Sequence, residues 1–164
     1  MKFGLPKDCD ESIREIHDYW LSIHPAEGLP ARDHMDPLDV PSLLPKLWMA
    51  NVERNPVRFR YRLIGSDVVQ ILGEDLTGQY FDECFENFDG SVPQTTLVDT
   101  CEQGCPAWRR GPAVLIRKDY KFKQMERIFL PFANDGATVD LLLALSVYIV
   151  DDGFGRAARS STIR

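Results

Sequence analysis

Hydrophobic residues recur with a helical spacing near the start of the chain. Over residues 10–24 four large apolar side chains return at three- and four-residue steps, which predicts an amphipathic helix. Ser12 and Glu15 have the spacing of a capping box, so we expect Ser12 to cap it. The apolar stripe needs a partner, either the sheet of its own chain or the sheet of a second subunit. Its members are Ile13, Ile16, Trp20 and Ile23.

The next pattern is typical of strands. Residues 48–53 and 58–64 have strand character, and the turn-forming segment 54–57 between them predicts a hairpin. In the second segment apolar and basic side chains alternate strictly, so they point to opposite faces. Phe59, Tyr61 and Leu63 lie on one face, and Arg58, Arg60 and Arg62 on the other.

Helices and then strands are predicted for the rest of the chain. Short helices are expected over 67–73, with Ser66 as the cap, and over 80–88, and a longer one over 92–103. Three strands follow, at 107–114, at 116–133 with an interruption near 120–124, and at 138–150.

The last of these strands is predicted to be central. It is apolar on both faces, so both sides of the sheet must be covered there. Asp135 and Gly136, just before it, form one of the strongest hairpin signals. The chain is therefore expected to have an α+β fold with an antiparallel sheet.

The 164 residues fit one domain with a sizeable core. We expect an N-terminal helix and Pro-rich leader over 1–44, a folded unit over 45–150, and a flexible tail over 151–164, which is small and polar. No apolar stretch reaches the length of a membrane span, and the N-terminus carries no secretory signal. A cytoplasmic location with reduced thiols is expected.

The charge of the chain argues against some partners. The net charge is −6, whereas nucleic-acid binding calls for a basic surface. Residues 74–103 hold eight acidic side chains and no Lys or Arg. We expect neither nucleic acid binding nor membrane insertion.

The order of elements and two stretches of sequence resemble a PAS domain. The stretch RFRYRLIGSDVVQILGEDLTGQYFDE has the rhythm of a strand, a short helix, two glycines and an aromatic residue, with Gly65, Gly73, Gly78 and Phe81 in place. The Pro- and Asp-rich leader over 32–45 is similar to that of short, stand-alone bacterial PAS-like proteins. The resemblance covers about 13–150.

The resemblance implies a sensor or adaptor without catalysis. Its fold is a five-stranded antiparallel sheet with short helices on one face, which enclose a small pocket, and an N-terminal helix on the outer face or on a second subunit. Such a domain binds a small molecule, a regulatory protein partner, or both, and a homodimer is compatible with it. The candidate pocket residues are Phe59, Tyr61, Leu72, Phe81, Phe85, Leu97 and Trp108.

The sequence leaves the cofactor open but argues against two that the family uses. Haem-binding members have a His on the pocket helix, whereas His17, His24 and His34 all precede the first strand here. Flavin photosensors carry a reactive Cys in an Asn-Cys-Arg segment, and this chain reads Gln79-Tyr80-Phe81 after Gly78.

Other constellations carry weaker hypotheses. The three arginines could bind an anion or an acidic partner, or form a solvated sheet surface. Cys101 and Cys105, four apart, would share a helix face, but no nearby His completes a metal site, and none is expected. A small cone-shaped α+β enzyme of the ketosteroid-isomerase kind is the alternative, with Asp82 or Asp99 as its acid or base. A ligand-free adaptor is a third possibility.

Overall fold

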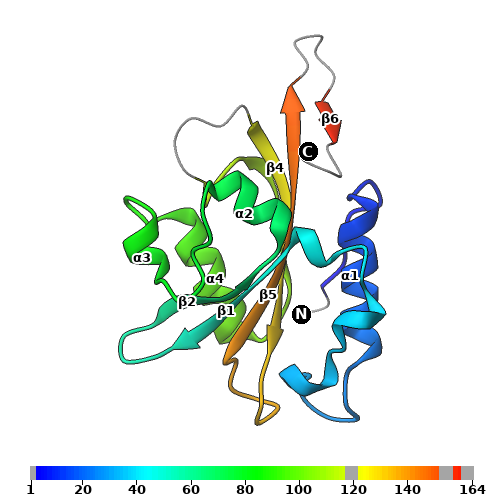
Figure 1. The fold of residues 1–164 in the computed structure, drawn as a ribbon. Coiled ribbons are helices and arrows are strands. Elements are labelled where there is room, and N and C mark those ends of the chain that lie inside the picture. The colour runs from blue at the N-terminus through cyan, green and yellow to red at the C-terminus, as the bar shows by residue number, and fades with distance from the viewer. Residues whose placement is uncertain (1–2, 117–121, 152–156, 160–164) are drawn as a thin grey trace.

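A computed structural model describes residues 3–116, 122–151 and 157–159. They form three layers, with one antiparallel sheet in the middle and helices on both of its faces (Figure 1). Its order is β2-β1-β5-β4-β3, and a short β6 pairs with β5. The α+β class and the five-stranded antiparallel sheet are confirmed. The strands are β1 (Leu47–Glu53), β2 (Arg58–Ile64), β3 (Ala107–Pro112), β4 (Phe122–Phe132), β5 (Leu141–Asp151) and β6 (Ala157–Arg159).

The predicted central position of the last long strand is confirmed. β5 lies between β1 and β4, and Ala144 is paired with Trp48 on one side and with Phe129 on the other. Residues 141–149 are all buried. Their apolar character on both faces follows from cover on both sides of the sheet.

Three strand predictions need correction. β3 ends at Pro112 rather than at 114. Residues 122–124 belong to β4, with a register shift between Phe122 and Gln124, where an interruption was predicted. Residues 157–159 pair with β5 although a flexible tail was predicted, because backbone pairing needs no apolar side chains. Residues 117–121, 152–156 and 160–164 lie outside the described part of the chain.

The helices follow the predicted order with changed ends. The N-terminal helix is capped by Asp10, not by Ser12: the Asp10 carboxylate accepts hydrogen bonds from the backbone N–H of Ser12, at 2.9 Å, and from its hydroxyl. The helix predicted over 80–88 is a four-residue turn, because Phe85 is already extended. The helices are α1 (Glu11–Ser22), α2 (Ser66–Leu72), α3 (Phe81–Cys84) and α4 (Val92–Gln103).

The leader between α1 and β1 holds three short 3₁₀ turns, η1 (Arg32–His34), η2 (Pro37–Asp39) and η3 (Leu44–Lys46). Together with α1 it covers the outer face of the sheet, while α2, α3 and α4 cover the inner face (Figure 1). None of the helices in the described ranges is long and apolar enough to cross a membrane.

Strand alternation divides most of the core into two clusters, one on each face of the sheet, and a small third cluster holds Ile71, Met125 and Tyr148. In β1, Trp48 and Ala50 point inward, whereas Leu47 and Met49 point outward. The inner cluster contains most of the aromatic side chains, and the outer one is largely aliphatic. The two clusters thus share the strands β1, β4 and β5 as a common wall.

Candidate functional site

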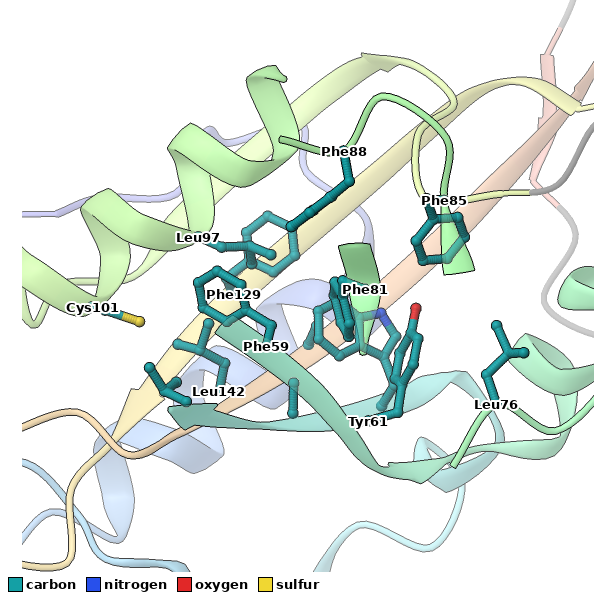
Figure 2. Close-up of a cluster of buried hydrophobic side chains, with 14 of the residues drawn as sticks. Phe59, Tyr61, Leu76, Phe81, Phe85, Phe88, Leu97, Cys101, Phe129 and Leu142 are labelled. Atoms are coloured by element: carbon teal, nitrogen blue, oxygen red, sulfur yellow. The ribbon is translucent and has the colours of Figure 1, made fainter. Parts of the chain in front are cut away.

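Six of the seven predicted pocket residues contribute to the inner face of the fold as buried side chains. Phe59 and Tyr61 come from β2 and Leu97 from α4 (Figure 2), and Leu72 comes from α2. Phe81 is at the centre, with its ring centroid 4.2 Å from that of Tyr61. The rings of Phe59, Phe85, Phe88 and Trp48 are 5.5–6.1 Å from the ring of Phe81, which is the spacing of packed aromatic pairs.

Trp108 does not belong to this group, and that prediction is wrong. In the register of β3 and β4 it is paired with Ile128, whose side chain is in the outer cluster. Cross-strand partners share a face of the sheet, so Trp108 packs against the outer cluster as well. Sequence spacing alone left the face of this residue open, because it depends on the pairing register.

The aromatic side chains nearly fill the space between sheet and helices. A cavity of about 10 Å³ remains, with Trp48, Tyr61 and Phe129 in its wall. This volume is close to that of one water-sized probe.

Three polar residues that the sequence analysis did not select contribute to the wall of the same cavity. They are Arg127 of β4 and Ser146 and Tyr148 of β5, all buried. Arg127 is paired with Ser146 across the two strands. Burial lowers the pKa of the Arg127 guanidinium to about 10 and raises that of the Tyr148 phenol to about 12. Ser146 stands out in the sequence as a polar residue of an otherwise apolar strand, whereas Arg127 has charged and polar neighbours in its own strand and gave no such signal.

An open cleft of about 570 Å³ lies next to this cavity, and Leu115 lines both. It runs between the segment from Cys84 to Pro93 and residues 115–116. Its wall is mixed: Phe85, Phe88 and Ile116 form an apolar part, and Glu86, Asn87 and Ser91 form a polar part. The residues of the cavity and the cleft thus form one continuous region of the fold.

The arginines of β2 are held by their own chain. Arg58 forms an ion pair with Asp82 at 2.7 Å and lies 3.6 Å above the ring of Tyr80. Arg60 donates a hydrogen bond to the Gly78 carbonyl at 2.8 Å, and Arg62 is exposed. The Arg58 guanidinium lowers the pKa of the Asp82 carboxyl. Arg58 therefore anchors α3, and Arg60 anchors the turn before it.

The α1 stripe covers the sheet of its own chain. Ile13, Ile16 and Trp20 are buried in the outer cluster, and Ile23, which follows the last helical residue, is half-buried against it. Trp20 also donates a hydrogen bond from Nε1 to the Pro131 carbonyl in β4 at 3.0 Å.

A fully buried carboxylate, Glu126 of β4, fixes the start of α1. Its Oε1 accepts hydrogen bonds from the backbone N–H of Asp10 at 2.7 Å and from Trp108 Nε1 at 3.0 Å. Arg110 lies 3.4 Å from its Oε2 and also forms an ion pair with Asp8 at 2.9 Å. The sequence analysis missed this cluster because residues more than 100 positions apart build it.

The remaining candidates do not form a site. Asp82 is bound by Arg58, and Asp99 is exposed on α4, so neither acid faces the inner cavity. Burial raises the pKa of Cys101 to about 12, and within the described ranges no three His, Cys, Asp or Glu side chains are grouped to hold a metal ion. His17 and His24 pack beside Trp20 on the outer side of the sheet, and His34 lies in the leader.

Comparison with known proteins gives one clear finding. The family model described as a PAS domain matches residues 9–146, which include α1 and nearly all of the sheet. A search of the curated proteins found no match.

Proposed function

The chain belongs to the PAS domain family, and from this premise we propose that it is a sensory domain that binds a small molecule and signals to a protein partner. The family is one of sensory and regulatory domains, and the residues matched include both faces of the sheet. The ligand, the partner and the absence of a catalytic step are parts of the proposal. A homodimer would be one form of the protein contact.

The observation that best supports this proposal is the double role of β4. Its inward residue Arg127 lines the inner cavity, and its outward residue Glu126 binds the backbone of Asp10 at the start of α1. A ligand that shifts β4 by a fraction of an ångström would therefore change the hydrogen bonds that hold α1. The two faces are connected through one peptide unit.

Signalling would follow from a population shift of α1 between a docked and a released state. Release would uncover the apolar outer face of the sheet, with Ile128, Leu130 and Leu143. Such a face is suited to a helix of a partner protein or to α1 of a second copy. The ligand would set the balance by binding one of the two states more tightly.

The alternative of an isomerase-like enzyme receives less support. Its acid or base would have to face an apolar pocket, but Asp82 is engaged with Arg58 and Asp99 is exposed. The third possibility, a ligand-free adaptor, shares the α1 mechanism and differs only in the occupancy of the inner cavity.

Native-state hydrogen exchange tests the α1 mechanism. We expect the α1 amides to exchange through a local opening that costs less free energy than the opening of β5. Glu126→Gln should speed exchange in α1 and leave α4 unchanged, while Glu102→Gln on the exposed side of α4 should alter neither. If α1 and β5 exchange only together, through global unfolding, α1 is no switch and the proposal fails.

A further inference from the structure

Arg127 is a buried cation with two nitrogens that lack a hydrogen-bond partner in the described part of the chain. Its side chain is on the inner face of β4, and the residue is 6% exposed. Neither Nε nor Nη1 has a hydrogen-bond partner within the described chain. A buried charge without partners is costly, and proteins seldom keep one unless a ligand or another group completes it.

The surroundings of Arg127 are suited to an anion. Among the residues that the structure describes, the lining of the cavity includes no Asp or Glu, and its polar side chains include Arg127, Ser146, Tyr61 and Tyr148. Burial keeps both phenols protonated by raising their pKa values, so each still has a proton to donate. Arg109, paired with Arg127 across β3 and β4, adds a second positive charge nearby.

We propose that Arg127 binds the carboxylate of a small monocarboxylic acid whose apolar body lies in the adjoining cleft. A guanidinium N–H and a carboxylate oxygen form a charge-assisted hydrogen bond, which is stronger than a bond between neutral groups. Nε and Nη1 of Arg127 point to different sides of the guanidinium, and each has a proton to donate to such an oxygen. This inference rests on the proposed sensory function and names the class of ligand for it.

The cavity is too small for a whole ligand, so the body of the ligand would have to lie in the adjoining cleft. About 10 Å³ holds no more than the head group, whereas the cleft on the other side of Leu115 measures about 570 Å³. Leu115 lies between the two, with a φ of 54° that L residues seldom adopt. A ligand body would therefore take the place of the Leu115 side chain and contact Phe85, Phe88 and Ile116.

The charge of the cleft favours one carboxylate over two. Glu86 is an acidic residue of its wall, so a second carboxylate of a ligand would lie beside another carboxylate. Phe85, Phe88 and Ile116 offer an apolar part of the wall for the body of the acid. The best fit is an aliphatic or aromatic acid such as octanoate or benzoate.

Isothermal titration of the full chain with octanoate and benzoate tests the proposal, with 1-octanol, benzyl alcohol, succinate and inorganic phosphate as comparison probes. We expect at least one of the two acids to bind, and its neutral alcohol to bind at least about tenfold more weakly. Arg127→Met should weaken acid binding by a similar factor and leave alcohol binding unchanged. It should also maintain or raise the melting temperature, since it removes a buried charge without partners.

A second variant separates a loss of binding from a loss of folding. Leu115→Trp fills the entrance from the cleft without touching the charge, so it should abolish acid binding while the melting temperature stays near that of the wild type. Arg62→Met, at an exposed arginine of β2, should bind the acids like the wild type.

Several outcomes would overturn the proposal. They are the absence of binding by both acids, equal binding of the alcohols, and unchanged acid binding by Arg127→Met. A marked loss of stability in Arg127→Met would assign Arg127 a structural role instead. Local opening of α1 without acid binding would refute this inference and leave the α1 mechanism intact. Acid binding without any change in α1 exchange would refute the α1 mechanism and leave this inference intact.

Discussion

Glu126 and Arg127 are consecutive residues of β4, and both are buried, but on opposite faces of the sheet. One is a carboxylate that accepts bonds from the start of α1 and from Trp108, and the other is a guanidinium beside the inner cavity. Two opposite charges are thus separated by the sheet rather than paired with each other. Their opposite directions follow from the alternation of side chains along a strand.

The bond from Trp108 to Glu126 should contribute measurably to stability. Trp108→Phe keeps most of the ring but removes the Nε1 donor, and we expect a loss of about 0.5–1.5 kcal/mol in the free energy of unfolding. Urea denaturation followed by circular dichroism measures it. Tyr80→Phe, which removes an exposed hydroxyl bond to Glu53, is the control and should cost only a few tenths. Equal losses in the two variants would contradict a special role for the buried bond.

Phe81 should be among the most sensitive positions of the inner cluster. It is fully buried and contacts the rings of Trp48, Tyr61 and Phe88. Phe81→Ala would leave a void in a nearly filled core and cost about 3–5 kcal/mol. Val92→Ala, at a residue 64% exposed, should change stability by less than about 0.5 kcal/mol. If thermal denaturation gave Phe81→Ala a melting temperature close to that of the wild type, the core would have to close around the void.

Gly65 should not accept a side chain. A Cβ there would lie 2.3 Å from the carbonyl oxygen of Leu44 and 2.5 Å from that of Pro45, and backbone atoms cannot move aside cheaply. We expect Gly65→Ala to lower stability by about 1–3 kcal/mol. Gly111→Ala meets nothing within 4 Å and should be neutral or slightly stabilising. Differential scanning calorimetry of both variants measures the difference. Similar melting temperatures would show that a Cβ at position 65 does not collide with the backbone.

The ion pair between Arg58 and Asp82 should make stability depend on acid pH. Arg58 lowers the pKa of Asp82 below its ordinary value of 3.8, so the stabilisation is present above about pH 4 and disappears as pH falls through the lowered pKa. The difference in melting temperature between the wild type and Asp82→Asn should therefore be constant at neutral pH and vanish in strong acid. Asp99→Asn, at an exposed residue of α4, is the matched control. A pH-independent difference would mean that the Asp82 side chain acts by shape alone.

The cysteines should differ in reactivity. Burial raises the pKa of Cys101 to about 12, and Cys9 is buried with a raised pKa as well, whereas Cys105 is half-buried. At pH 8 only about one Cys101 thiol in ten thousand is ionised. Iodoacetamide followed by mass spectrometry should therefore modify Cys105 well before Cys101. Equal rates would indicate that α4 opens readily.

The sequence predicted the architecture better than the site, for physical reasons. Strand periodicity and the double-sided apolar run are local signals, so the hairpin 47–64 and the central position of β5 could be predicted. The face of Trp108 and the pairing of Glu126 with Asp10 depend on register and on the docking of distant segments. Those are products of the tertiary fold, which no short window of sequence contains.

The same limit applies to Arg127. In the sequence it is one of several basic residues in a positively charged stretch, and its neighbours Arg109 and Arg110 are exposed. Only the cover given by α2 and residues 113–116 makes it a buried cation. A charged residue at an inward position of a covered strand is therefore worth testing as a site residue even without a motif.

The three tryptophans divide the molecule into optically distinct compartments. Trp48 is surrounded by rings of the inner cluster, and Trp108 lies beside the charges of Glu126 and Arg110. Trp20 belongs to α1 and donates its N–H to the Pro131 carbonyl. Chains that retain one tryptophan at a time would thus emit from one compartment each. Their fluorescence could follow cavity filling, helix release and the buried carboxylate separately, in real time and without any attached dye.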